Sequence, residues 1–174
     1  MDSSRRYTGI AIINHWLTAL LVIAMLTLGL AAGAAPSEDI EDYILGIHFS
    51  LGFITLLFVF WRVGYRLRQG FPPQPDNGPI ESLLAKAVHR LLLLVLILQV
   101  LTGPLYLFTE GEGFSVFGLF TFYLPLESLS AIHEPMEEIH VITGVYLLPA
   151  LLVIHILGGM RHFLRNESKS PAAG

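Results

Sequence analysis

The sequence contains no cysteine among its 174 residues. This absence excludes disulfides, thiolate metal sites, iron–sulfur clusters and covalently attached c-type haem. Charge is also scarce, because only 14% of the residues are charged, against about a quarter in a typical soluble domain. With 53% hydrophobic residues and seven histidines, we expect the chain to lie in membrane lipid and to use histidine as its main soft ligand. We expect no nucleic-acid partner.

Four apolar segments are long enough to cross a bilayer, which takes about 20 mostly apolar residues. They lie at about residues 8–32, 43–65, 83–108 and 138–163. We therefore predict an all-α fold, an integral membrane four-helix bundle that forms one domain over residues 1–165. The polar residues 166–174 are expected to form a flexible tail.

The first apolar segment has a second interpretation. Arg5 and Arg6, the apolar run and the small residues 31–35 are also typical of a signal peptide. The run is longer than the apolar region of most signal peptides, and it carries His15 and Trp16. A membrane-spanning helix is therefore favoured.

The charged residues indicate the orientation in the membrane. All ten Lys and Arg residues lie in the N-terminal segment, around the second connection or in the C-terminal segment. The first and third connections carry only acidic charges, namely Glu38, Asp39, Glu41, Asp42, Glu110, Glu112, Glu127, Glu134, Glu137 and Glu138. Because positive loops stay in the cytoplasm, both termini are expected to be cytoplasmic and the acidic loops to face outward.

The histidines within the apolar segments fall into two sets by depth, and an ionisable residue at such a position is a functional hypothesis. His48 and His140 lie near the outer starts of the second and fourth segments. His15 and His89 lie near the cytoplasmic ends of the first and third. His155 follows His140 by fifteen residues, about 22 Å along a helix, which returns it to the cytoplasmic side.

Two histidines from opposite helices can bind a haem iron from both sides, and the core of a helix bundle is where such cofactors lie. Glycine follows three of the histidines by four residues, at Gly52, Gly144 and Gly159. Residues four apart share a helix face, so each glycine would leave room for a flat ring. Structural histidines are the alternative, and glycine also serves close helix packing. The spacing favours haem.

One detail of the fourth segment does not fit a straight helix. Fifteen residues rotate an α-helix by about 60° beyond whole turns, so His140 and His155 would not share a face. Pro149 lies between them and lacks a backbone N–H group. We predict a kink or a bulge near Pro149 that absorbs the offset.

Five stretches occur in order along the chain: RYTGIAIINHWLTALL, GIHFSLGFITLLFVFWRVGYRLR with Pro72 and Pro73 after it, AKAVHRLLLLVLILQVLTG, FSVFGLF, and HVITGVYLLPALLVIHILGGMRHF. Together they resemble the four helices and the last outer loop of the bacterial cytochrome b561 family of di-haem membrane proteins. The resemblance covers nearly the whole chain. It implies two non-covalent haem b groups in the bundle core.

The resemblance also implies which histidines bind iron. By position, the inner axial ligands would be His15 and His155, and the outer ones His48 and His140. His89 then lies outside the set of iron ligands. The family usually separates the two ligands of its last helix by one residue fewer than this chain does.

Other residues match family positions near the cytoplasmic face. His89 and His162 are expected to contact haem propionates or a quinone headgroup, although His162 is equally well explained as an interfacial histidine without a cofactor. Propionates are anions that usually pair with cations or hydroxyls. Arg62, Arg66 and Arg90 are candidates for this pairing, and the alternative is that they only anchor the topology.

The resemblance implies a multi-pass protein of the bacterial inner membrane that passes electrons between a periplasmic-side partner and ubiquinone in respiratory electron transport. An enzyme that oxidises superoxide and reduces ubiquinone is the alternative. The acidic outer loops should repel superoxide and attract a basic periplasmic redox protein. A haem-free metal carrier lined by histidines is a remote third possibility. The sequence assigns no catalytic residue.

Overall fold

The computed structural model describes residues 9–70 and 78–167 of the chain. Some features of the sequence fall outside these residues. They are Arg5 and Arg6, the prolines after the second helix, residues 168–174 of the expected tail, and the side chain of His162. The tail's first residues, Asn166 and Glu167, belong to the last helix.

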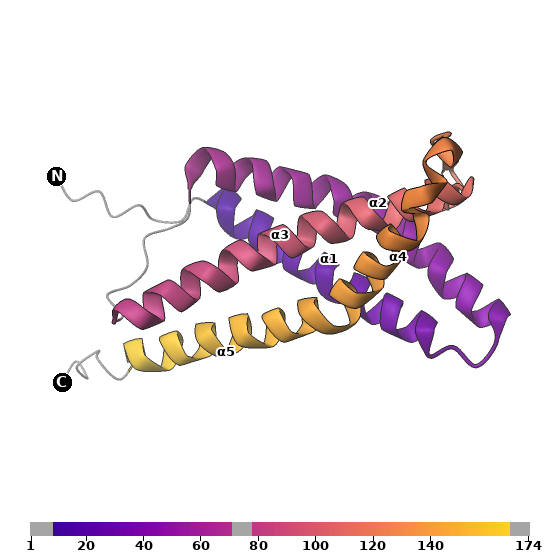
Figure 1. Cartoon of the computed structure of the whole chain (residues 1–174). Helices are drawn as coiled ribbons and strands as arrows, with labels where there is room; N and C mark the ends of the chain where they lie inside the picture. The colour runs from indigo at the N-terminus through magenta and orange to yellow at the C-terminus, as the bar shows by residue number, and fades with distance from the viewer. Residues whose placement is uncertain (1–8, 71–77, 168–174) are drawn as a thin grey trace.

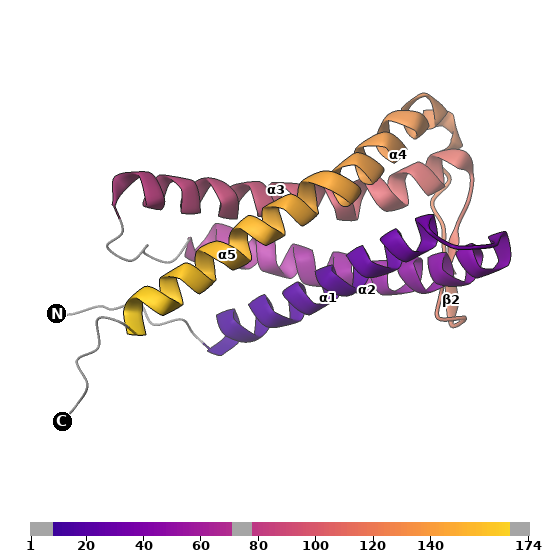
Figure 2. The same cartoon turned by 90° about the horizontal axis from the view of Figure 1, so that it is seen from below.

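Four helical spans form a bundle, and Figures 1 and 2 show it from two directions. The first three spans are α1 (Gly9–Gly33), α2 (Glu38–Gln69) and α3 (Pro79–Glu110). The fourth consists of α4 (His133–Ile142), one π-helical turn η2 (Thr143–Leu147) and α5 (Leu148–Glu167). Each span is long and apolar enough to cross a membrane. The predicted all-helical membrane fold with four spans is therefore confirmed.

The helix ends are determined by local sequence. α2 extends beyond its apolar segment at both ends, with acidic residues in its first turn and Arg66 and Arg68 in its last, which complement the helix dipole. α3 begins at Pro79, whose fixed φ suits the first helical turn. It stops at Gly111, which has a φ of 89° and donates its N–H to the carbonyls of Leu107 and Phe108.

The helices pack in two main pairs, α1 against α2 and α3 against α4 and α5. A small apolar cluster at mid-depth joins them, with Val22, Val59, Val95 and Leu148 at its centre. Many other large apolar side chains are exposed, including Leu20 at 67%. Such a surface suits lipid, which replaces water as the solvent of these faces.

A short hairpin crosses the end of the bundle that carries the acidic connections, which we call the outer end (Figure 2). Its strands are β1 (Phe114–Val116) and β2 (Phe120–Phe122), which pair antiparallel. Phe114 and Val116 of the hairpin form a second apolar cluster with Phe108 of α3. The hydroxyl of Ser50 on α2 accepts the N–H of Phe117 at 3.0 Å, which ties the hairpin to the bundle. A 3-10 helix, η1 (Glu127–Ile132), leads from the hairpin to α4.

Candidate functional site

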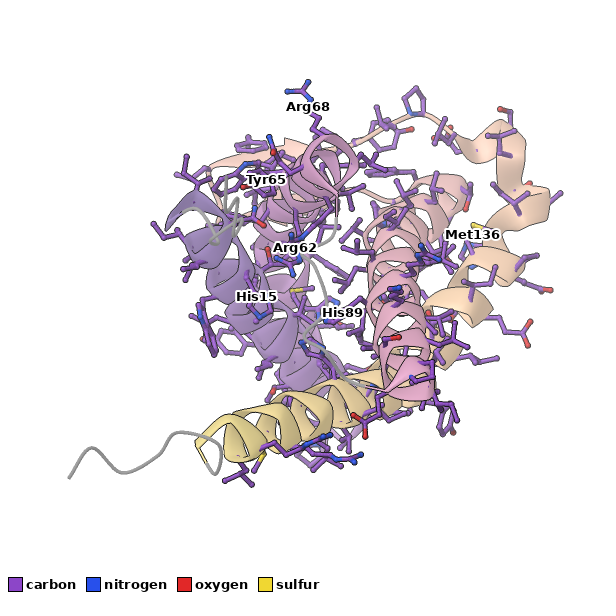
Figure 3. The ribbon with its side chains drawn as sticks, turned by 90° about the vertical axis from the view of Figure 1, so that its left-hand side faces the viewer. His15, Arg62, Tyr65, Arg68, His89 and Met136 are labelled. Atoms are coloured by element: carbon purple, nitrogen blue, oxygen red, sulfur yellow. The ribbon has the colours of Figure 1, made fainter. Side chains whose placement is uncertain are left out.

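The opposite half of the bundle, which we call the inner half, contains a layer of three histidines. His15 on α1 and His155 on α5 have ring centroids 6.1 Å apart and ring planes at 87°. His89 on α3 lies on another side of His155, with a centroid separation of 5.1 Å. Figure 3 shows His15 and His89 pointing into the bundle, while Arg68 points away from it. The three inner histidines that depth alone grouped together are therefore neighbours.

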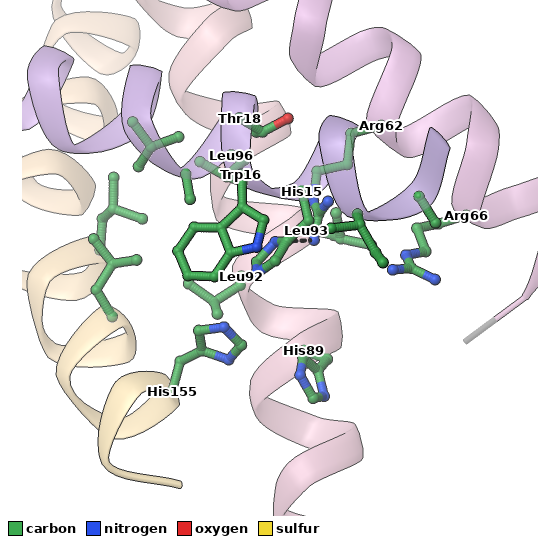
Figure 4. Close-up of a pocket in the computed structure, with 16 residues that line it drawn as sticks. His15, Trp16, Thr18, Arg62, Arg66, His89, Leu92, Leu93, Leu96 and His155 are labelled. Atoms are coloured by element: carbon green, nitrogen blue, oxygen red, sulfur yellow. Dashed lines mark hydrogen bonds between the residues drawn. The ribbon is translucent and has the colours of Figure 1, made fainter. Parts of the chain in front are cut away.

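A cavity of about 310 Å³ lies at this inner layer (Figure 4). Its polar lining residues are His15, Trp16, Thr18, Arg62, Arg66, His89 and His155. The remaining lining is apolar and comes from α1, α3 and the fourth span. Trp16 and Ile12 belong to the lining yet stay exposed at 67% and 46%, so the cavity reaches the surface of the bundle. Its volume falls within the range of small-molecule sites.

Arg62 on α2 determines how His15 is oriented. One guanidinium nitrogen lies 3.0 Å from Nδ1 of His15, and the other donates to the side-chain oxygen of Asn14 at 3.3 Å. Arginine can only donate, so Nδ1 of His15 is the acceptor in this arrangement. This leaves Nε2 as the ring nitrogen available to another group. Together with Arg66, Arg62 makes the inner layer positively charged.

The outer half of the bundle contains a second layer. His48 on α2 and His140 on α4 have ring centroids 6.3 Å apart and planes at 87°. The hydroxyl of Thr102 lies 3.3 Å from Nδ1 of His140. The ring of Tyr106 has its centroid 6.0 Å from that of His140. Beyond Tyr106 lies His133, whose Nδ1 is 2.9 Å from the Tyr106 carbonyl oxygen.

Two glycines allow the outer rings to lie against neighbouring helices. A Cβ atom on Gly29 of α1 would be 3.4 Å from Cε1 of His48. A Cβ atom on Gly103 of α3 would be only 2.8 Å from Cε1 of His140. The three glycines singled out from the sequence lie elsewhere. Gly52 faces the Met25 side chain, Gly144 faces the amide of Gln99, and Gly159 has nothing within 4 Å.

The two layers are linked by a regular spacing. In each of the first three helices, the residues at the two depths are fourteen positions apart: His15 and Gly29, His48 and Arg62, His89 and Gly103. Fourteen residues make four turns at 3.5 residues per turn, the period of helices in a left-handed supercoil. This spacing could have identified Gly29 and Gly103 in the sequence, whereas the four-residue spacing did not.

The fourth span separates its two histidines by fifteen residues and contains the π-helical turn η2 between them. This is the bulge expected near Pro149. Across the turn, the N–H of Leu148 donates to the carbonyl of Thr143, five residues back. Pro149 immediately follows and cannot donate a backbone hydrogen bond, which favours an irregular turn at this point.

Comparisons with known proteins identify the family of the chain. The family model described as prokaryotic cytochrome b561 matches residues 6–171. A protein of Yersinia pestis named probable superoxide oxidase CybB is 28% identical over 161 residues, which cover 88% of this chain and 91% of the relative. A protein of Escherichia coli K12 named cytochrome b561 homolog 2 is 27% identical over 172 residues, covering 95% of this chain and 89% of the relative.

The contact of Gly103 with His140 predicts a difference between two glycine substitutions. Gly103→Ala should lower the stability by about 1–3 kcal/mol, because the new methyl group must displace the His140 ring or the helix. Gly46→Ala in α2 is the matched control, since a Cβ there meets nothing within 4 Å. It should be neutral or slightly stabilising. Thermal unfolding of both variants in detergent measures this, and equal midpoints would contradict the close contact.

Proposed function

This chain belongs to the prokaryotic cytochrome b561 family, a family of b-type haem proteins of bacterial membrane electron transfer, and from that membership we propose a more specific role. The protein is a di-haem cytochrome of the inner membrane. It passes electrons between a partner on the outer side and ubiquinone in the membrane. Its two histidine layers are the two haem sites.

The observation that carries this proposal is the near-equal geometry of the two layers. Their ring centroids are 6.1 Å and 6.3 Å apart. Two imidazoles on opposite sides of one metal ion, each with a metal–nitrogen bond of about 2 Å and a ring centre about 1 Å beyond it, have centroids about 6 Å apart. Each pair therefore fits axial ligation of its own iron. His15 and His155 form the inner pair, and His48 and His140 form the outer pair.

The surroundings of both pairs fit a flat macrocycle as well. The inner pair lines the 310 Å³ cavity, and the outer pair faces two helices that carry glycine at the same depth. A haem bound there would supply reversible one-electron transfer. The chain itself contributes the ligands, a largely apolar surrounding and the separation of the two layers, about 21 Å along each helix for fourteen residues.

Arg62 and Arg66 are the residues we assign to the inner propionates. An imidazole that binds iron through Nε2 carries its remaining proton on Nδ1 and can no longer accept a hydrogen bond there. Arg62 would then be released from His15, at the edge of a cavity that Arg66 also lines. A guanidinium group pairs well with a carboxylate, so the released charge has a suitable anion beside it.

His89 is the residue we assign to the quinone side. It lies beside His155 and lines the inner cavity. It does not belong to either of the two histidine pairs whose ring centroids are about 6 Å apart. A quinone headgroup that takes up electrons also takes up protons, and a histidine is suited to deliver them. His162 remains a second candidate by its position in the sequence.

A superoxide oxidase is the second candidate function, and the name of the Yersinia pestis relative favours it. In that reaction two superoxide anions each give one electron and become O₂, and one ubiquinone takes up both electrons with two protons. The charge of the outer loops argues against it, because their charged residues are all acidic. For a haem-free metal carrier, the described ranges hold no group of three metal-ligating side chains that would support the proposal.

Single histidine substitutions test the assignment of the two haems. The purified wild-type protein should contain two haem b per chain and show a reduced b-type α-band. His48→Ala or His140→Ala should remove only the outer haem, and His15→Ala or His155→Ala only the inner one, because each loses one axial ligand. His89→Ala is the matched control and should keep both haems while slowing quinone reduction. Haem stoichiometry and redox titration measure these outcomes, and two haems in any axial variant would defeat the assignment.

The orientation can be tested cleanly because the chain has no native cysteine. Single cysteines at Glu41 and Glu112 should react with a membrane-impermeant maleimide in intact spheroplasts, since both positions lie in the acidic connections. Cysteines at Arg68 and Glu81 should react only after lysis. The reverse pattern would place the acidic loops in the cytoplasm and refute the proposed direction.

Stopped-flow kinetics distinguish the two candidate functions. With a basic cytochrome as partner, we expect electron exchange to slow steeply as salt increases, because opposite charges steer the encounter. With superoxide, we expect slow haem reduction that becomes faster with salt, because the acidic surface repels the anion. Haem reduction by superoxide near the diffusion limit at low salt would instead establish the oxidase function.

A further inference from the structure

The fourth span contains one residue more between the two layers than the other three helices contain. Fourteen positions separate the layers in α1, α2 and α3, whereas fifteen separate His140 from His155. The additional residue adds about 100° of rotation, so His140 and His155 would lie about 60° apart around the axis of a straight α-helix. The two side chains would then not share the inward face.

The π-helical turn η2 absorbs this additional residue. It joins the carbonyl of Thr143 to the N–H of Leu148, so five residues lie where an α-helix has four. The fourteen residues that remain equal four turns of a supercoiled helix. Both histidines accordingly face the interior, and both meet their partners at the similar centroid separations of 6.3 Å and 6.1 Å.

The side chain of Gln99 on α3 holds this turn from the neighbouring helix. Its amide nitrogen donates to the carbonyl of His140 at 2.8 Å and to the hydroxyl of Thr143 at 2.6 Å. The Thr143 hydroxyl in turn donates to the carbonyl of Ile139. A π-turn displaces the backbone hydrogen bonds of an α-helix, and in lipid an unsatisfied carbonyl is costly. The His140 carbonyl keeps the N–H of Thr143 as a backbone donor, and Gln99 supplies a second donor to it.

Gly144 makes this approach possible. A Cβ atom at Gly144 would lie 3.2 Å from the amide nitrogen of Gln99, closer than is comfortable. The Gln99 amide therefore occupies the space that the missing side chain leaves, directly beside the widened turn. The helix just after His140 is therefore shaped by a single contact site, which consists of Gln99, Thr143 and Gly144.

We propose that Gln99 is a positioning residue for both haem sites. It stabilises the π-turn, and the π-turn keeps His140 in register with His48 and His155 in register with His15. Gln99 acts through the backbone of the fourth span and is itself no iron ligand. This inference rests on the proposed function, because it takes the four histidines to be the axial ligands.

Deletion of Val145 is the sharpest test. It removes one exposed residue from the turn, so Leu148 becomes the fourth residue after Thr143 and their hydrogen bond becomes an ordinary α-helical one. His140 and His155 are then fourteen residues apart without a bulge. We expect the variant to retain two haems with unchanged low-spin EPR signals. Deletion of Leu57, an exposed residue of uninterrupted α2 between His48 and Arg62, is the matched control and should lose haem.

Gln99→Leu then identifies the role of the side chain. In the full-length protein it should lower the haem content or shift the low-spin EPR signal of the outer haem, because the turn loses its donor. In the protein lacking Val145 it should change neither, because no π-turn remains to be held. A residue of only general structural importance would have the same effect in both backgrounds.

The outcomes separate this inference from the proposed function. A wild-type protein without haem would overturn the proposed function and the inference with it. Two haems in the wild type, but loss of haem on deletion of Val145 to the same extent as on deletion of Leu57, would overturn the inference alone. Equal effects of Gln99→Leu in both backgrounds would also overturn it.

Discussion

Four helices can build two layers of facing side chains only if each helix turns the same face inward at both depths. This register constraint organises the molecule. It explains the fourteen-residue spacing in α1, α2 and α3, and it explains why the fourth span needs a π-turn for its fifteen. In lipid, apolar burial does not drive helices together, so close packing and polar contacts must maintain the register. The contact of Gln99 with the backbone of His140 is of this kind.

The two layers share one plan but differ in what occupies its remaining positions. The outer layer places Gly29 and Gly103 beside its histidine pair, and those glycines let the rings lie against helix backbone. In the inner layer, the two helices that supply no member of the histidine pair carry Arg62 and His89, which line a cavity that reaches the bundle surface. The inner layer is therefore charged and accessible, and the outer layer is neutral and tightly enclosed. This difference supports propionate pairing and quinone exchange at the inner layer.

The sequence alone predicted the helical spans and the grouping of the histidines by depth. Both follow from the apolar length of a single segment and the rise per residue of a single helix. It was insufficient for contacts between helices. Gly52, Gly144 and Gly159 share a face with a histidine of their own helix, but the space beside a ring belongs to the neighbouring helix. Gly29 and Gly103 could be found only from the spacing common to several helices. Gln99 carried no signal, since a glutamine within an apolar segment does not reveal which backbone carbonyl it reaches.

The charge of the outer surface acts on an electron partner in two ways, through the acidic loops as a whole and through the groups next to the outer histidine pair. Charges farther apart than about 8 Å are largely screened at physiological salt, so the acidic loops as a whole mainly steer partners that approach from solution. Close to the outer pair, the ring of Tyr106 lies beside His140, and His133 contacts the Tyr106 carbonyl. There, a carboxylate oxygen of Glu137 lies 3.8 Å from Nε2 of His133. The local charge therefore has the same sign as the overall field. Both charges would attract a cationic partner more strongly than an anion, which supports the proposed basic redox protein over the superoxide reaction named for one relative.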